Sequence, residues 1–307
     1  MNRSRILSLT AVIAVLAGTS IFAGASVQGS FEKTYQVSGP VDLQVLTRSG
    51  DVTVRSGAAG TVTVRGRIHV GDRWFGGDRQ SAVSDIEKNP PIQQTGNSIH
   101  IDYINEHDIA VDYEITTPPD TTVTTHSGSG DQRVEGLRAP LKLESGSGDM
   151  ELEEITGQVQ AHTGSGNVVA RDISGPFSAE AGSGDIRLDE KSKGDVYIRT
   201  GSGNVELRGV DGMLDAHSGS GDVTIEGRNS GRWEIRTSSG NVELNLPQGS
   251  GFDLDASAGS GSVVVDRPVT MTIQGDLRRA QHELRGKVSG GGPELLVHTG
   301  SGDVRIH

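Results

Sequence analysis

Apolar residues recur in pairs, two positions apart, at a fixed distance from a repeated Ser-Gly-Asp/Asn phrase. One pair follows the glycine of the phrase by two and four residues, as Val205 and Leu207 do. Another pair precedes it by seven and five residues, as Val196 and Ile198 do. Residues two apart lie on the same face of a strand, and a polar residue such as Glu206 stands between them. Each repeat therefore predicts two short strands, each with one buried and one solvated face.

The phrase occurs ten times and sets the period of the chain. Its serines are Ser49, Ser129, Ser147, Ser165, Ser183, Ser202, Ser220, Ser239, Ser260 and Ser301. From Gly130 to Gly261 the successive motif glycines are 18, 18, 18, 19, 18, 19 and 21 residues apart. A fixed period is the signature of a repeat architecture. The pattern predicts an all-β fold, a parallel right-handed β-solenoid (β-helix) of two-strand rungs of about 18–20 residues each.

Two turns would close each rung. The second turn carries a glycine nine residues before the motif glycine, as at Gly157 and Gly175. Glycine reaches positive φ without Cβ strain, and Asp or Asn can bond nearby backbone N–H groups. The predicted corner glycines are Gly130, Gly148, Gly166, Gly184, Gly203, Gly221, Gly240, Gly261 and Gly302. A β-propeller is the alternative, since pairs of repeats could mimic its blades, but the same turn in every unit favours the solenoid.

Two irregular segments interrupt the period. Residues 26–120 are expected to form N-terminal strands and a cap, in which residues 81–88 form a short helix that Asn89-Pro90-Pro91 stops. Residues 121–307 are expected to form the regular solenoid, with an insertion at about residues 267–292. Terminal rungs would otherwise expose unpaired edges, so capping is the favoured role of both segments. A binding surface is the alternative.

The first 25 residues have the features of a signal peptide. Arg3 and Arg5 precede an apolar run over residues 6–16, and cleavage is expected after Ala25, at the end of Ala23-Gly24-Ala25. An uncleaved membrane anchor is the alternative. No later apolar stretch approaches the ~20 residues that span a bilayer, so no transmembrane span is expected after signal removal. These features predict an exported protein, which would be periplasmic, cell-surface or secreted.

Composition narrows the classes of partner and chemistry. The 307 residues include 44 glycines, only 4% are aromatic, and the net charge is −12. That charge disfavours a nucleic-acid backbone or an anionic membrane as the partner. The chain has no cysteine, which excludes disulfides, thiolate metal sites and cysteine nucleophiles.

The arrangement of motifs resembles a known family. An apparent export signal is followed by an irregular segment with a short helix, by the repeated turns, and by Gly-Gly-Gly-Pro-Glu-Leu-Leu-Val-His-Thr-Gly-Ser-Gly-Asp-Val-Arg-Ile at residues 290–306. Over residues 31–307 the chain resembles the bacterial putative-adhesin domain family, which is related to auto-transporter adhesin head domains. The resemblance implies a β-helical fold at the cell envelope and a role in adhesion. It brings no catalytic or cofactor-binding residues.

The polar residue of the corner is the best metal candidate. In chain order this column reads Asp131, Asp149, Asn167, Asp185, Asn204, Asp222, Asn241, Ser262 and Asp303. A calcium ladder through its regular aspartates Asp131, Asp149, Asp185 and Asp222 is one interpretation, since calcium takes about six to eight oxygen ligands. Calcium-binding nonapeptides repeat twice as often, however, and here amides interleave with the carboxylates. Structural turn chemistry, with no metal and no cofactor, is the favoured interpretation.

A second column, four residues before each motif glycine, is expected to face outward. Its histidines are His126, His162, His217 and His298. The nearest two are two rungs, or roughly 9–10 Å, apart, so a solvated charge ladder is favoured over a zinc site. The motif serine recurs in every turn, which indicates a turn residue rather than a nucleophile. Trp74 and Phe75 could be an exposed aromatic anchor or a plug within the cap.

The sequence favours a non-enzymatic, exported solenoid that acts as a structural or adhesive module. Its partner is unknown, and an envelope protein or a polysaccharide is possible. A polysaccharide-active β-helix enzyme is the alternative from another class, and an envelope sensor or assembly factor is a third. The turns through residues 130–261 have almost no loops, which leaves little chain to build a catalytic cleft.

Overall fold

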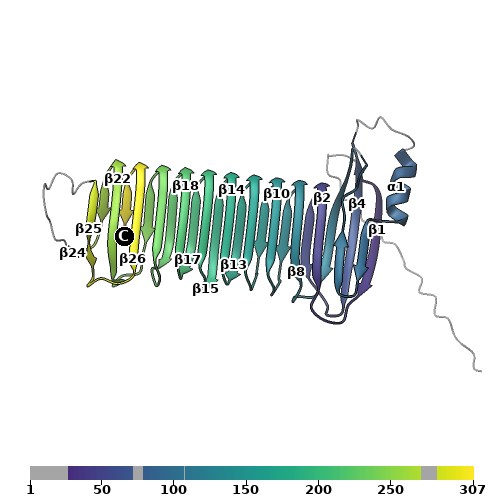
Figure 1. The fold of residues 1–307 in the computed structure, drawn as a ribbon, viewed down its shortest axis with the longest axis horizontal. Coiled ribbons are helices and arrows are strands. Elements are labelled where there is room, and N and C mark those ends of the chain that lie inside the picture. Colours follow the sequence, from purple (N-terminus) through teal and green to yellow (C-terminus); the bar gives the residue numbers. More distant parts are fainter. Residues whose placement is uncertain (1–26, 72–78, 107, 271–281) are drawn as a thin grey trace, which may run out of the picture.

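The computed structural model describes residues 27–71, 79–106, 108–270 and 282–307. They form a straight rod of two facing β-sheets whose strands lie across the rod axis (Figure 1). Almost all neighbouring strands within the regular part are parallel and in register, as β10 and β12 are from Leu141 opposite Val159 to Ser147 opposite Ser165. The predicted all-β parallel solenoid with two strands per rung is confirmed.

Within the described ranges, sheet A holds thirteen strands and sheet B fourteen. In spatial order, sheet A contains β1 (Val27–Gln36), β4 (Thr61–Val70), β7 (Ile109–Thr117), β3 (Val52–Ser56), β9 (Gln132–Glu135), β11 (Met150–Glu153), β13 (Val168–Ser174), β15 (Ile186–Ser192), β17 (Val205–Asp211), β19 (Val223–Arg228), β21 (Val242–Asn245), β27 (Val304–Ile306) and β23 (Val263–Val265). From the same end of the rod, sheet B contains β5 (Ile92–Thr95), β6 (Ser98–Ile101), β2 (Asp42–Ser49), β8 (Thr122–Ser129), β10 (Leu141–Ser147), β12 (Val159–Ser165), β14 (Phe177–Ser183), β16 (Val196–Ser202), β18 (Leu214–Ser220), β20 (Trp233–Ser239), β26 (Glu294–Ser301), β22 (Phe252–Ser260), β25 (Glu283–Val288) and β24 (Val269–Thr270).

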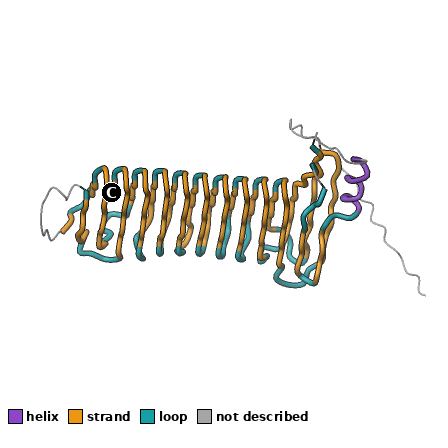
Figure 2. The backbone as a smooth tube through the Cα atoms, turned by 45° about the horizontal axis from the view of Figure 1, so that its top comes forward, coloured by secondary structure: helices purple, strands orange, loops and turns teal. Residues whose placement is uncertain are grey.

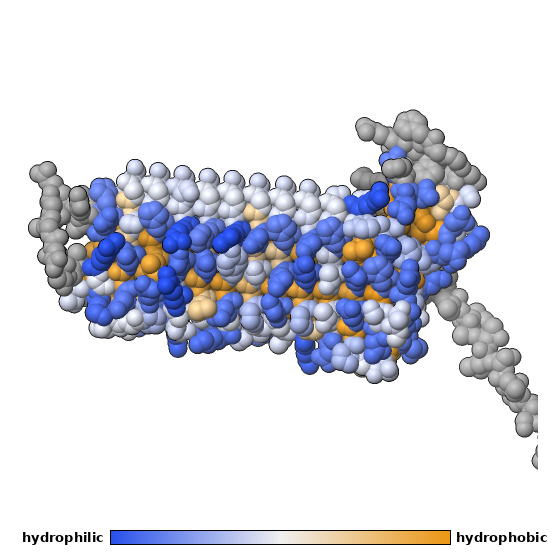
Figure 3. Space-filling model, viewed as in Figure 1, coloured by the Kyte–Doolittle hydropathy of each residue, from blue (hydrophilic) through white to orange (hydrophobic). Residues whose placement is uncertain are grey.

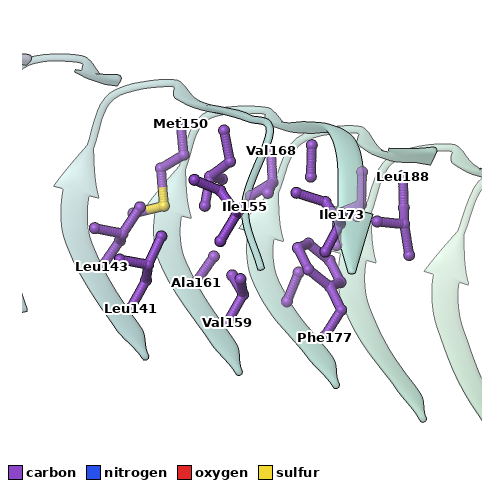
Figure 4. Packing of buried hydrophobic residues seen from close by; sticks show 14 of the residues in the cluster. Leu141, Leu143, Met150, Ile155, Val159, Ala161, Val168, Ile173, Phe177 and Leu188 are labelled. Atoms are coloured by element: carbon purple, nitrogen blue, oxygen red, sulfur yellow. The ribbon is translucent and has the colours of Figure 1, made fainter. Parts of the chain in front are cut away.

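A thin apolar core fills the space between the sheets. Leu141 and Leu143 of β10 point toward Met150 of β11 within the same rung, and all three are almost fully buried (Figure 4). Lys142, between the two leucines, is exposed. Burying each such side chain stabilises the fold by about 1.5–3 kcal/mol. Because each rung buries only a few of them, the stability of one rung depends on its two neighbours.

The N-terminal end of the rod is closed by antiparallel strands and one helix. Strands β1, β4 and β7 pair antiparallel at the end of sheet A. The helix α1 (Arg79–Lys88) lies against β1 and buries Val83 and Ile86 (Figure 2). The Ser30 N–H of β1 donates a hydrogen bond to Glu87 Oε1 of the helix at 2.9 Å. The predicted helix over residues 81–88 is confirmed and begins two residues earlier, at Arg79.

At both ends the order of the rungs differs from the order of the chain. The rung of β6 and β7 lies outside the earlier rung of β2 and β3. At the other end, the C-terminal rung of β26 and β27 lies between the rung of β20 and β21 and the rung of β22 and β23. Figure 1 shows β26 in yellow inside the end of the rod. Each irregular segment therefore returns the chain to the rod one rung out of sequence.

Candidate functional site

The motif glycines form one long edge of the rod. At each of the nine predicted corner glycines, an added Cβ would lie under 3.0 Å from the motif-glycine carbonyl of the adjacent rung. Most of them also have positive φ, such as +130° at Gly130 and +148° at Gly221. A side chain at these positions would collide with backbone, which cannot move aside without breaking the stack. The corner therefore requires glycine for steric reasons at each of these nine positions.

The polar residue after each motif glycine forms a hydrogen-bonded column along this edge, which we call the corner ladder. The Asp149 N–H donates to Asp131 Oδ1 at 2.9 Å, and the Asn167 N–H donates to Asp149 Oδ1 at 2.7 Å. The same bond recurs from rung to rung. In spatial order the ladder is Asp112, Asp51, Asp131, Asp149, Asn167, Asp185, Asn204, Asp222, Asn241, Asp303 and Ser262.

At its C-terminal end, the order of the ladder residues along the rod differs from the order in the sequence, which was the expected one. Asp303 lies between Asn241 and Ser262 rather than after Ser262, because the C-terminal rung is inserted before the rung of β22 and β23. From Asp149 to Asp303 carboxylates and amides now alternate without a break. Each Asn separates two carboxylates, which lowers their mutual repulsion. The Asn241 side-chain amide also donates to Asp222 Oδ1 at 3.2 Å.

Asp112 is a member of the ladder that sequence reasoning missed. Its Oδ1 accepts the Asp51 N–H at 2.9 Å, and its Oδ2 lies 2.8 Å from His69 Nε2. Ala110 and Val111 precede it in place of Ser-Gly, so the motif does not mark it. The sequence signal that could have identified Asp112 is the pair Tyr113 and Ile115, which lie one and three residues after it. Apolar residues occupy the same two positions after most of the other ladder residues.

One oxygen of each ladder Asp or Asn is already engaged in a protein hydrogen bond. Each Oδ1 accepts a backbone N–H, and Arg187 and Arg305 lie 3.0 and 2.8 Å from the remaining oxygens of Asp185 and Asp303. Bonds from the Ser262 backbone and hydroxyl hold the pKa of Asp303 below its usual range. Over the described residues, no group of three or more His, Asp or Glu side chains is placed to hold a metal ion. The geometry suits turn chemistry, and the calcium alternative stays a prediction to be measured.

A second polar column lies inside the same edge. Among the described residues, five buried hydroxyls three residues before a motif glycine donate to a motif-glycine carbonyl of the adjacent rung, as Thr163 does to Gly148 at 3.2 Å and Thr299 does to Gly240 at 2.9 Å. Thr200, Ser218 and Thr237 make the same bond. Sequence reasoning missed this column, although Ser, Thr or Ala occupies it in every regular rung.

The histidine column lies on the outer face of sheet B, as predicted. His126 Nδ1 is 3.0 Å from Glu144 Oε2, and His162 Nδ1 is 3.5 Å from Glu180 Oε2. Half or more of the His126 and His162 side chains is exposed. Hydrogen bonds from Lys142 and then His126 lower the pKa of Glu144. Register places Glu144 between the two histidines, so this column alternates charge types instead of gathering imidazoles.

Sheet A presents a comparable charge ladder on its own outer face. Glu151 bridges three rungs, with its carboxylate oxygens 2.8 Å from Arg133 and 2.9 Å from Arg171. Arg187 lies 3.5 Å from Glu206 in the same way. Exposed pairs of this kind contribute about 0–1 kcal/mol each. Their effect is to keep both outer faces polar and regular.

One carboxylate is buried at the opposite edge of the rod. Glu190 is 8% exposed and aligns across a β-bulge with Ile173, which is fully buried. Its Oε2 accepts the Asp211 N–H at 3.4 Å, and its Oε1 has no hydrogen-bond partner among the described residues. Burial, together with the nearby charges of Asp211 and Asp195, raises the pKa of Glu190 to about 8. The sequence signal was a carboxylate two residues after the core residue Leu188.

Shallow grooves mark the surface of the rod. One of about 520 Å³ follows the second corner past Arg138, Glu154 and Lys191. Two smaller ones lie on the outer face of sheet B, with about 270 Å³ over β10, β12 and β14 and about 330 Å³ over β16, β18 and β20. On the face shown in Figure 3, an interrupted apolar band follows the middle of the rod between polar side chains.

Two predicted features lie outside the described residues. They are the signal peptide with its cleavage after Ala25, and the aromatic pair Trp74 and Phe75. Within the described part of the chain, no helix is long and apolar enough to cross a membrane.

Two solved structures are similar to this chain. A putative cell adhesion protein from Clostridium sporogenes ATCC 15579 is 12% identical, with a TM-score of 0.26, over 90% of this chain and 98% of that one. A putative adhesin from Bacteroides fragilis NCTC 9343 is 11% identical, with a TM-score of 0.39, over 91% of this chain and 98% of that one. No curated protein matches.

A family model matches the chain twice. The matches to the Toastrack DUF4097 model cover residues 33–196 and 159–307, and they overlap within the regular rungs. Together they include every rung described above. The chain therefore belongs to the Toastrack DUF4097 family.

Proposed function

We propose that this chain is a non-enzymatic, exported β-solenoid that acts at the envelope or cell surface as a structural or adhesive module. Residues 1–25 would direct export, residues 26–120 would cap the rod, and residues 121–307 would present its long faces. The rod supplies a rigid display surface, and its outer side chains supply the contacts with a partner.

The observation that carries this proposal is the strict register of the outer faces. Strands β8 to β20 of sheet B align residue for residue, from His126 opposite Glu144 to His217 opposite Arg236. Charged side chains form ion pairs along these faces, as Arg133 and Glu151 do on sheet A. Over the ranges that the structure describes, they do not cluster at one position, as the side chains of a catalytic site would. A flat, repeating surface of this kind suits an extended partner laid along the rod.

Export is tested by fractionation and N-terminal sequencing of the expressed full-length chain. A mature protein that begins after Ala25 in the exported fraction supports the proposal. Retention in the cytoplasm with an intact N-terminus contradicts it.

Adhesion is tested with purified mature chain, coupled to beads and presented to intact cells and to immobilised envelope extract. Saturable attachment that excess free chain competes away supports an adhesive role. No attachment to either surface leaves a purely structural role. Release of reducing sugars from envelope polysaccharide by the purified chain would overturn the non-enzymatic proposal and favour the β-helix enzyme.

A further inference from the structure

We propose that the groove over β16, β18 and β20 is a saccharide-binding subsite that takes an uncharged stretch of polysaccharide. This inference rests on the adhesive function proposed above and names the ligand class of one surface. The groove measures about 330 Å³ and lies on the outer face of sheet B. Its lining combines four apolar or aromatic residues with four charged ones, so it is more polar than most ligand pockets, as a site for a hydroxyl-rich ligand should be.

Apolar side chains break the polar pattern of the face at this point. Tyr197 occupies the outward position that Ser178 and Asp215 hold in the adjacent rungs. Met213 is 54% exposed, and among the described large apolar residues only Val264 is comparably exposed. A single exposed apolar side chain is ordinary, but Met213 and Tyr197 line the same groove, and together they give it an apolar surface that a ligand would cover.

The Tyr197 ring is held in a fixed orientation. The Arg199 guanidinium lies 4.7 Å from the ring centroid, in a cation–π contact. Arg199 does not line the groove, so it supports the ring from outside. A fixed aromatic ring beside a thioether offers a flat apolar surface to the C–H face of a pyranose, while the tyrosine hydroxyl can still hydrogen-bond.

Charged groups surround this apolar surface and can bond sugar hydroxyls. Carboxylates accept hydrogen bonds and a guanidinium donates them, whereas a hydroxyl can do both. Arg232 holds Glu234 at 3.0 Å, and the Met213 N–H donates to Asp195 Oδ1 at 3.1 Å. Arg236 pairs with the other oxygen of Glu234, so these contacts hold that carboxylate in place, whereas Asp195 keeps its second oxygen to accept a bond from a ligand.

The charge of the lining selects among glycans. Three carboxylates (Asp195, Asp215 and Glu234) and Arg232 line the groove, and Arg199 and Arg236 lie beside it against Tyr197 and Glu234, which brings the local charge to 3 − 3 = 0. The groove therefore offers an anion no net positive charge, and the whole chain carries −12. Anionic polysaccharides and acidic peptides are therefore disfavoured, and an uncharged glycan fits.

The experiment uses the purified mature chain and two probes, cellotetraose and tetra-N-acetylchitotetraose, measured by isothermal titration calorimetry. We expect saturable binding of at least one probe to the wild type. We expect Tyr197→Ala to weaken it about tenfold and Met213→Gln to weaken it less. Lys142→Ala is the matched control, because it removes an exposed side chain from the same outward column of β10, and it should leave binding unchanged.

Circular dichroism and the thermal midpoint establish that each variant is folded. The subsite is overturned if the folded wild type binds neither probe, or if Tyr197→Ala binds as the wild type does. Tighter binding of polygalacturonate, or of an acidic or apolar peptide, would overturn the ligand class. Loss of probe binding with intact attachment to cells would not contradict the proposed adhesive function, whereas absence of attachment with intact probe binding would contradict that function alone.

Discussion

The Asp303 N–H donates to Asn241 Oδ1 at 3.0 Å, although 62 residues separate the two in sequence. This bond joins the C-terminal rung to the rung of β20 and β21. It makes the corner ladder continuous along the rod, and it places the rung of β26 and β27 between two other rungs instead of at the end of the rod.

Removal of a ladder carboxylate should destabilise the rod. Asp222→Ala leaves the Asn241 N–H without its acceptor, and we expect a loss of about 1–2 kcal/mol in the free energy of unfolding. Urea unfolding followed by circular dichroism measures it. Glu226→Ala, an exposed residue of the same rung, is the control and should change stability by less than about 0.5 kcal/mol. Equal effects for both variants would show that the ladder bond contributes nothing specific.

The collision at a corner glycine can be separated from its backbone conformation. Gly221 and Gly249 both have positive φ, at +148° and +82°, but only at Gly221 would a Cβ meet backbone, because nothing lies within 4 Å at Gly249. Gly249→Ala should therefore cost about 1 kcal/mol, and Gly221→Ala about 2 kcal/mol more. Thermal unfolding of the two variants provides the comparison. A smaller loss for Gly221→Ala would contradict the steric account.

Glu190 should make stability depend on pH. Its pKa is about 8 in the folded chain, above its ordinary value of 4.5, so the unfolded chain loses the proton first as pH rises. The contribution to stability is full below about pH 4.5, falls between about 4.5 and 8, and is flat above 8. Glu190→Gln should consequently raise stability by about 1–3 kcal/mol at pH 8 and by little at pH 4.5.

Urea unfolding of wild type and Glu190→Gln at several pH values measures this dependence. Asp189→Asn is the control, since Asp189 is the neighbour of Glu190 in β15 and its side chain is about half exposed. A difference between wild type and Glu190→Gln that does not vary with pH would exclude titration of Glu190 as its cause.

The C-terminal rung should behave as interior rather than as a frayed end. Leu295 is fully buried between Trp233 and Leu254, so Leu295→Ala should cost about 2–5 kcal/mol, as at a central position such as Leu143. Leu284→Ala, in β25 near the end of sheet B, should cost less because Leu284 is only partly buried. Urea unfolding tests both. A loss for Leu295→Ala no larger than that for Leu284→Ala would contradict the inserted position.

Calcium should have little effect on this rod. The ladder Oδ1 atoms already accept backbone N–H groups, as Asp131 does from Asp149, and the amides reduce the charge that a cation would need. The melting midpoint should therefore move by no more than a degree or so between millimolar calcium and a chelator. A rise of many degrees with calcium would establish the calcium ladder instead.

Much of the fold was predictable because each rung repeats the same local rules. The pair Leu141 and Leu143 fixed the inward face of a strand, and the glycine before Asp149 fixed the corner. The helix near Ser81 was also predictable, since two prolines stop it. The residues of the corner ladder that follow a motif glycine could be named from the sequence. Their hydrogen bonds could not, because these depend on which rungs are neighbours. At the ends of the rod the local sequence pattern does not determine that order.

The sequence by itself determined the rung: its two strands, its glycine corner and its polar outer faces. These follow from side-chain alternation and from Cβ sterics, which act over a few residues. Only the tertiary structure decided that Asp303 precedes Ser262 in the ladder, that Asp112 joins it, and that Glu190 is buried. The reason is physical, because strand pairing depends on where the chain returns after a long excursion, and burial depends on what packs against a residue from the adjacent rung.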